Sequence, residues 1–252
     1  MERMVYCEAE GNISEITQRG AIMKIQKGFT LVEIAIVLVI VGLLLAAVLK
    51  GQEMITQGKI KGAITDFNSV LTAFNGYQDR YKVIPGDDAN AATRWPTGAF
   101  GSGSAAAVNG NGNGSVEGLY STNILLTAAP TGTQETNLCW QHLRASGFYA
   151  GTQTGNGSGT LPTNVAGGTI GVENDTNTSD ANGIKMGGIL ICSTSIPEKI
   201  AQAVDTQIDD GDATLGSVRS IAIPSTGVLP PLTTNPTAYD TASSFVVCRP
   251  TT

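Results

Sequence analysis

Histidine, charge and metal-ligand patterns are all scarce in this sequence. Among its 252 residues only His142 is a histidine, and charged residues make up 14%, against about 25% in an average soluble domain. The four cysteines show no metal-ligand spacing, which argues against a zinc site. There is no Ser/His/Asp order and no nucleophile elbow, so no motif indicates catalysis. The net charge of −6 argues against nucleic acid as a partner, because binding the phosphate backbone needs a basic face.

One long apolar run stands out against this background. From Phe29 to Leu49 every residue is apolar or glycine except two, of which Glu33 is a carboxylate. As a helix the run would span about 31 Å, the thickness of a bilayer core. Lys24 and Lys27 precede it, which predicts a cytoplasmic N-terminal side and an exported remainder. A secretory signal peptide is the first alternative, but its apolar region is shorter and ends in a small-residue cleavage site.

A plain signal-anchor helix is the second alternative, and it leaves Glu33 unexplained, because a carboxylate in a membrane segment is costly. The sequence of residues 27–33, Lys-Gly-Phe-Thr-Leu-Val-Glu, resembles the processing motif of type IV pilins and of the related pseudopilins of type II secretion. The resemblance implies that a prepilin peptidase cuts after Gly28 and that the new N-terminal residue, Phe29, is methylated. It also implies that Glu33 is kept for assembly. Gly42 falls where many pilins carry a glycine.

The sequence departs from the pilin pattern in one respect. Many pilins have a proline shortly after that glycine, whereas this chain has none between Gly28 and Ile84, and Lys50 and Gly51 stand near the expected place. Absence of the proline is more usual among pseudopilins and minor subunits. The resemblance therefore favours a minor pilin or a pseudopilin over a major pilin.

Elementary electrostatics agrees with the assembly role that the resemblance implies for Glu33. A buried carboxylate and a buried amine are each costly alone and tolerable as a pair. Glu33 of one subunit could pair with the Phe29 amine that cleavage creates on its neighbour. A head-to-tail contact of this kind that does not close on itself produces a helical filament.

The expected domain organisation follows from the motif. Residues 1–28 are a leader peptide, 29–51 a membrane and filament-core helix, and 52–252 a globular domain that includes the second half of the helix. Residues 1–22 are acidic and have no apolar run, whereas Met23 opens a good short leader. Either the leader is unusually long or translation begins at Met23, and both interpretations give the same mature chain.

Periodicity predicts an α+β fold similar to that of pilins. Apolar residues at three- and four-residue steps extend the first helix to about residue 82, before Pro85. A second helix is expected at 134–146, with Trp140 inward and the only histidine in a structural or surface position, not a catalytic one. Ser195 and Glu198 match a capping box that would open a further helix. Strands are expected at 187–193 and 244–249 and, more weakly, in 215–223 and 223–228. Residues 101–118 are predicted to form a low-complexity surface loop.

Two further site hypotheses concern cysteine and calcium. Export to an oxidising compartment favours a disulfide, and pilins often fasten their C-terminal region with one. We therefore expect Cys192–Cys248, with Cys139 free and buried. Acidic residues close together in the segment 207–216 could form a calcium loop, as in major pseudopilins, although a polar turn is the simpler interpretation: Asp209, Asp210 and Asp212. No other cofactor is expected.

The sequence thus predicts a structural filament subunit and not an enzyme. Its expected partners are copies of itself, other pilins or pseudopilins, the prepilin peptidase and an inner-membrane assembly platform. It would first be a single-pass protein of the bacterial inner membrane, and then part of a periplasmic or extracellular filament. A filament-tip adhesin is the nearer alternative, since Gly/Thr/Asn-rich loops suit surface contact, and a membrane-anchored periplasmic enzyme is the more distant one.

Overall fold

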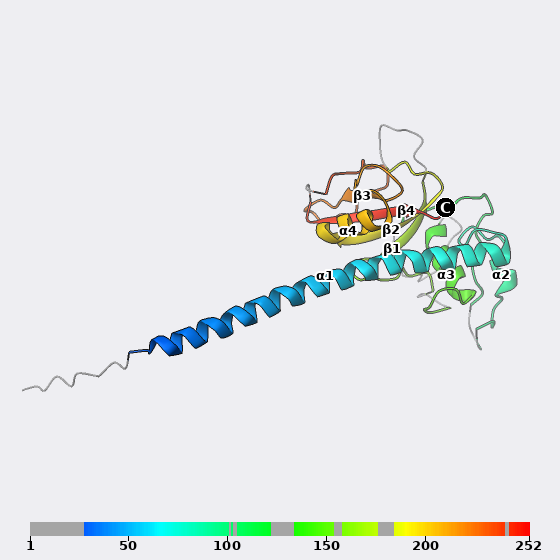
Figure 1. Ribbon diagram of the computed structural model, residues 1–252. Helices are drawn as coiled ribbons and strands as arrows, with labels where there is room; N and C mark the ends of the chain where they lie inside the picture. The colour runs from blue at the N-terminus through cyan, green and yellow to red at the C-terminus, as the bar shows by residue number, and fades with distance from the viewer. Residues whose placement is uncertain are drawn as a thin grey trace, which may run out of the picture. The chain divides into compact units, whose positions relative to one another are not determined.

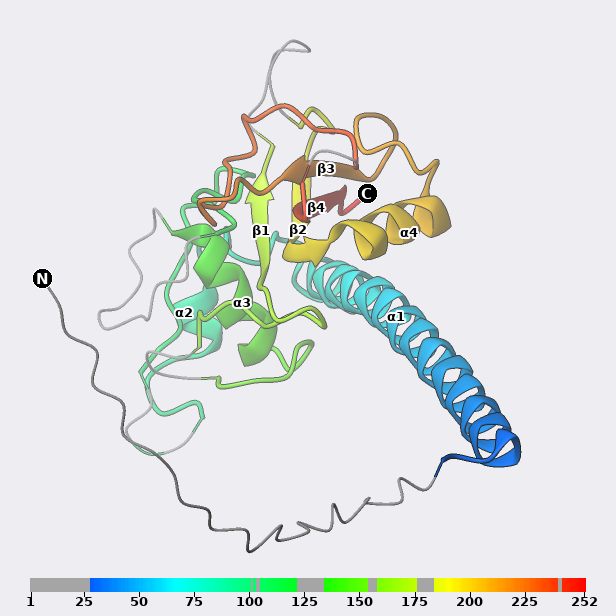
Figure 2. The same cartoon turned by 90° about the vertical axis from the view of Figure 1, so that its left-hand side faces the viewer.

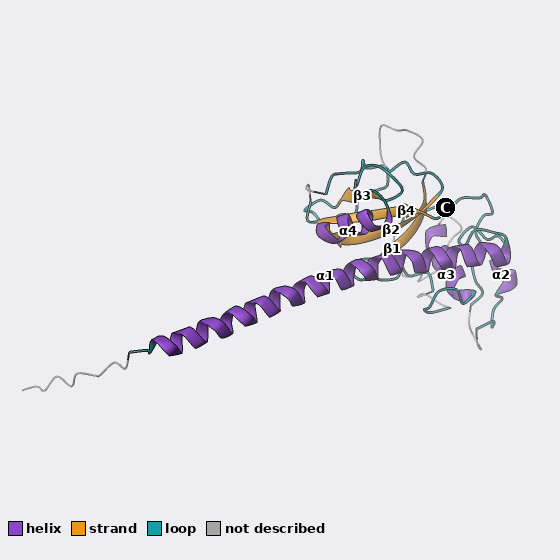
Figure 3. Cartoon of the chain, viewed as in Figure 1, coloured by secondary structure: helices purple, strands orange, loops and turns teal. Residues whose placement is uncertain are grey.

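A computed structural model of the chain describes residues 28–100, 102, 105–121, 134–153, 158–175, 184–239 and 242–252. Residues 1–27, which include Met23 and Cys7 and belong to the expected leader, lie outside these ranges. The chain divides into two units, Met1–Leu49 and Lys50–Thr252. Its helices and strands are drawn in Figures 1 and 3: α1 (Leu31–Tyr81), α2 (Ala91–Arg94), α3 (Glu135–Ala145), β1 (Ile170–Asn174), β2 (Ile189–Pro197), α4 (Glu198–Ile208), β3 (Arg219–Ala222) and β4 (Ser244–Pro250).

The long helix that periodicity predicts is confirmed as α1. In the second unit its apolar stripe is buried, at three- and four-residue steps: Ile60, Ala63, Phe67, Val70, Ala73, Phe74 and Tyr77. Gly76 has a packing reason on this helix, because a Cβ there would lie 2.9 Å from the ring of Phe148. The helix ends where Lys82 adopts a φ of 61°, shortly before Pro85, which could not continue it.

The four strands form one antiparallel sheet in the order β1-β2-β4-β3. One face carries Val172, Ile191 and Val247, which join the core cluster of α1, α3 and α4; Figure 2 shows α4 and the second half of α1 on the same side of the sheet. The opposite face carries Cys192 and Cys248 and is covered by side chains from the connecting segments: Tyr120, Ile184 and Leu232. The fold is therefore α+β, as the sequence predicts.

Both edges of the sheet are covered by the chain itself. Along β1, the N–H of Asn174 donates to the carbonyl of Val116 at 3.1 Å. Along β3, the N–H of Ser220 donates to the carbonyl of Ala213 at 2.9 Å, and its own carbonyl accepts from Thr237. Covered edges limit unwanted pairing with another sheet.

Several local predictions are wrong. Ser195 does not cap a helix: it lies inside β2, where its φ of 57° accompanies a register shift between Ser193 and Ile196. The helix still starts at Glu198, with Pro197 as an N-cap that makes no side-chain bond. Residues 223–228 form no strand. The strand β1 was not expected, because Gly171 interrupts its apolar pattern.

Residues 105–118, most of the described part of the predicted surface loop, are fixed by hydrogen bonds to two carboxylates elsewhere in the chain. Ala107 and Val116 are buried. The carboxylate of Asp87 accepts backbone N–H bonds from Asn113 and Gly114 at 2.9 and 2.7 Å, and that of Glu135 holds two further N–H groups in the same way. Buried carboxylates thus order a segment whose composition alone suggested a plain surface loop.

Candidate functional site

The motif glutamate belongs to the first turn of α1. Residues 28–30 are not helical, and the N–H of Ile34 makes the first helical bond, to the carbonyl of Thr30 at 3.3 Å. Oε2 of Glu33 accepts from the Thr30 backbone N–H at 2.9 Å and from its hydroxyl at 2.8 Å. In return the Glu33 N–H donates to the Thr30 hydroxyl oxygen at 3.2 Å. This reciprocal pair is a capping box.

Sequence reasoning overlooked this capping box, although the signal was present in the motif. Thr30 and Glu33 have the Thr-x-x-Glu spacing that defines it, directly before an apolar run. The carboxylate also lies at the end of the helix where the backbone dipole favours negative charge. Glu33 therefore has a local structural role besides any role in assembly.

The surface of the first unit is apolar along the helix. Its large side chains are exposed, from 91% at Leu31 to 45% at Val41. In the part of the chain that the structure describes, α1 is the one helix long and apolar enough to cross a membrane. A shallow groove follows one side of it, lined by Val32, Ala35, Ile36, Val39 and Ile40. Such a surface suits lipid or another apolar helix, and not water.

The scissile bond implied by the resemblance lies just before this helix. Gly28 and Phe29 precede the first helical residue, and Phe29 is 83% exposed. A side chain at Gly28 would meet no atom within 4 Å. The peptide bond between them thus lies outside the helix and joins two exposed residues.

The cysteines are placed as the pilin resemblance led us to expect. Cys192 and Cys248 form a disulfide between directly paired residues of β2 and β4, and both are fully buried. Cys139 is a free thiol in α3 with no exposed surface, and burial raises its pKa well above the ordinary value. It is therefore protected from reaction in the folded protein.

The structure does not bring together the three aspartates named for calcium. One carboxylate oxygen each of Asp205, Asp209 and Asp210 lie within 4.8 Å of one another. Asp205 comes from the last turn of α4, which sequence reasoning missed because it read the site as one contiguous loop. Asp212 is not in this group, and its Oδ1 accepts from the N–H of Thr214 at 2.9 Å. Calcium binding by this segment stays a prediction.

Of the two positions expected for His142, structural and surface, the structure shows the structural one. The side chain of His142 is fully buried, with Nδ1 accepting from the Gly86 N–H at 2.9 Å and Nε2 lying 2.8 Å from the carbonyl of Val108. Because Nδ1 accepts, Nε2 carries the proton and donates it. Both ring nitrogens are occupied, so the imidazole is not available as a general base.

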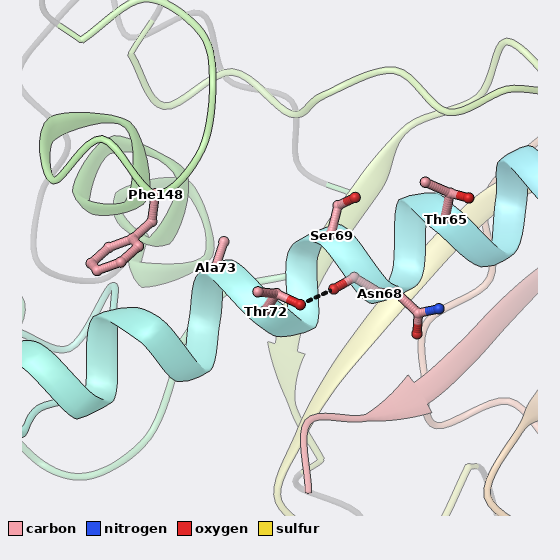
Figure 4. Close-up of a pocket in the computed structure, with 6 residues that line it drawn as sticks. All are labelled: Thr65, Asn68, Ser69, Thr72, Ala73 and Phe148. Atoms are coloured by element: carbon pink, nitrogen blue, oxygen red, sulfur yellow. Dashed lines mark hydrogen bonds between the residues drawn. The ribbon is translucent and has the colours of Figure 1, made fainter.

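Figure 4 shows a shallow hollow on α1. Four polar side chains of the helix line it, together with Ala73 and with the ring of Phe148, which follows α3: Thr65, Asn68, Ser69 and Thr72. The Thr72 hydroxyl donates to the carbonyl of Asn68 at 2.7 Å. No titratable side chain lines the hollow. It offers hydrogen bonds and no acid or base.

The fold and the motif together define a class: an α+β protein whose N-terminal helix exposes an apolar surface behind a capped glutamate. Compared with known families, residues 23–49 match the model described as the prokaryotic N-terminal methylation motif, the signature of type IV pilins and their precursors. The chain therefore has the N-terminal motif of a type IV pilin-like or pseudopilin substrate. No curated protein and no solved structure matches it.

Proposed function

We propose that this protein is a structural subunit of a type IV pilus or of a type II secretion pseudopilus. It is made as a precursor, held in the inner membrane by residues 29–51, cut after Gly28 and methylated on Phe29. It then moves from the membrane into a filament, where its apolar helix packs against the helices of other subunits. The methylation motif of residues 23–49 carries this proposal, and the exposed apolar surface of the first unit supports it.

The assembly step rests on Glu33 and on the amine of Phe29. Cleavage creates this amine four residues before the carboxylate, at the same end of the helix. A neighbour displaced along the helix axis can present its amine to Glu33, so that two costly charges neutralise each other. The surrounding apolar surface can exchange lipid for other helices without a change in polarity. Such a contact is head-to-tail and extends into a filament.

A minor pilin or pseudopilin is favoured over a major pilin. The segment from Gly28 to Ile84 has no proline, and α1 accordingly runs from Leu31 to Tyr81 as one helix. Prolines are the usual cause of a sharp kink. The partners would be other copies or other subunits, the prepilin peptidase and the assembly platform.

For the second unit, Lys50–Thr252, a structural role is also favoured over a catalytic one. His142 is buried and both its nitrogens bind backbone groups. The hydroxyl of Ser220 is buried beside Tyr239, which donates to Asp205 at 2.6 Å. These groups have partners inside the core and no access to a substrate. Detectable hydrolytic turnover by the purified second unit would contradict this part of the proposal.

The direct test is mass spectrometry of filaments sheared from cells that express the full chain. We expect a peptide that begins at a methylated Phe29. An abundant peptide would indicate a major subunit and traces a minor one. Its absence from filaments and membranes alike would overturn the proposal.

The variant Glu33→Ala tests the pairing step separately. We expect it to be cut after Gly28 as efficiently as the wild type and to be recovered in sheared filaments at least about ten-fold less, the loss that 1.4 kcal/mol of binding would give. Glu53→Ala, which removes an exposed carboxylate paired with Lys50 at 2.8 Å, is the matched control and should assemble normally. Normal filaments made of Glu33→Ala alone would show that the pairing is not needed.

A further inference from the structure

The two carboxylate oxygens of Glu33 have different surroundings. Oε2 accepts both bonds from Thr30, at 2.9 and 2.8 Å. Oε1 accepts no hydrogen bond from any residue that the structure describes. Within the described part of the chain, the side chain of Glu33 is therefore held by one of its two oxygens.

We propose that Thr30 is a positioning residue for Glu33, which holds Oε2 at the N-terminal rim of α1 and leaves Oε1 free for the Phe29 amine of a second copy. This inference rests on the proposed filament function and deepens it. It assigns to the threonine hydroxyl a part in assembly that the carboxylate cannot perform alone.

The physical argument is one of preorganisation. An unheld glutamate side chain has several rotamers, and ordering it at the moment of contact costs free energy. Near a bilayer surface a free carboxylate also turns outward toward water, away from the helix axis. The bonds from Thr30 remove both costs before the neighbour arrives. They survive processing, because cleavage after Gly28 leaves the peptide bond between Phe29 and Thr30 intact.

The reverse bond strengthens the arrangement. The Thr30 hydroxyl oxygen accepts from the N–H of Glu33 at 3.2 Å, so the residue that binds the carboxylate also fixes the first helical turn. A change in the position of the Thr30 hydroxyl would therefore alter both the Glu33 rotamer and the place of Oε1 relative to the helix. Serine can make the same three bonds, whereas valine has the shape of threonine and can make only the backbone one.

The test compares Thr30→Val with Thr30→Ser in the full chain, expressed in cells that form filaments. We expect Thr30→Val to reduce recovery in sheared filaments roughly five-fold, the factor that corresponds to a lost N-cap, while the fraction cut after Gly28 stays unchanged. Thr30→Ser should restore recovery. The matched control is Thr56→Val, because Thr56 lies on the same helix and its hydroxyl donates to the carbonyl of Gln52 at 3.0 Å, within its own helix.

Amide hydrogen exchange of the processed chain in detergent micelles gives the second readout. The N–H of Glu33 should exchange several-fold faster in Thr30→Val than in the wild type or in Thr30→Ser. Normal assembly of Thr30→Val, or equal defects in the valine and serine variants, would overturn the positioning role of Thr30 and leave the proposed function standing. Unchanged exchange at Glu33 would show that the cap is not formed. A wild type that is processed but never enters filaments would overturn the proposed function as well.

Discussion

His142 and Glu173 are both buried, and each is held by backbone groups. Burial lowers the pKa of His142 to about 4, although the hydrogen bond to Val108 opposes this shift. Burial raises the pKa of Glu173 to about 7, against the effect of the Tyr120 N–H that its carboxylate accepts at 2.9 Å. The histidine is not the proposed site of any chemistry, so these shifts are statements about stability.

The two residues give opposite pH dependences. Between pH 4 and 6.5 the unfolded chain binds a proton at His142 that the folded protein does not, so this residue makes stability rise with pH. Between about pH 4.5 and 7 the folded protein keeps a proton on Glu173 that the unfolded chain has lost, so this residue makes stability fall with pH. In the window that they share, the two effects partly cancel.

Glu173→Gln should separate them. Glutamine keeps an oxygen for the Tyr120 N–H and carries no charge, so the cost of ionising a buried carboxyl disappears. We expect the midpoint of thermal unfolding at pH 8 to rise by roughly 2–4 °C, the shift that about 1 kcal/mol gives in a domain of this size. The midpoint should then rise from pH 4 to 6.5 and stay level above. Circular dichroism of the full chain in micelles measures this, with the exposed Glu53→Gln as control; a midpoint at pH 8 equal to that of the wild type would contradict the argument.

Among the elements, β2 and β4 form the centre of the sheet, and the disulfide joins them. Cys192 and Cys248 are separated by 56 residues, and the segment between them includes α4 and β3. Closing a loop of that length removes much of the freedom of the unfolded chain, worth about 4 kcal/mol in the entropic model. The bond also fastens the last strand of the chain next to the strand that precedes α4.

Replacing both cysteines by alanine should therefore lower the unfolding midpoint by roughly 8–16 °C. Treating the wild type with a reductant should produce a similar shift, whereas the double variant should not respond to it. Cys139 serves as an internal control, because a buried thiol of raised pKa should react with an alkylating reagent only on unfolding. A wild type that is fully reduced, as shown by mass, and yet unfolds at its original temperature would contradict this role.

The elements that could be predicted from the sequence are those with a strong local pattern. The helix α1 follows from its apolar steps, and β2 and β4 from short apolar runs. The strand β1 was missed because Gly171 interrupts its pattern, yet a Cβ there would lie 2.0 Å from the carbonyl oxygen of Tyr120. The need for glycine arises from a distant segment that no local pattern reveals.

The same limit applies to the polar sites. Four N–H groups of the loop donate to Asp87 or Glu135, which are 18 to 27 residues away: those of Asn111, Asn113, Gly114 and Glu117. Composition alone could not reveal these partners and suggested only a surface loop. Asp205 belongs to the last turn of α4, and it joins the acidic group because this helix ends next to Asp209 and Asp210. The start of α1 is different, since Thr30 and Glu33 are three residues apart and their capping box could have been read directly.

At the scale of the whole molecule, the two units bury their side chains differently. Residues 29–49 contribute none to the core, whereas the second unit contains both core clusters. The core of the second unit begins on α1 at Ile60. The first unit thus supplies an apolar surface for lipid or for other helices, and the second supplies its own hydrophobic stabilisation.

A chain that begins at Lys50 should therefore fold without the first unit. We expect it to be soluble without detergent, to be monomeric by sedimentation, and to unfold within about 2 °C of the full chain in micelles, because residues 29–49 bury no side chain in the core. A chain that begins at Asn68 is the matched control: it lacks Ile60, Ala63 and Phe67, which are buried in the core, and large apolar losses of this kind cost several kcal/mol each. It should be unfolded or aggregated. If both truncations behaved alike, folded or not, the division of the chain at Lys50 would not reflect where its stability lies.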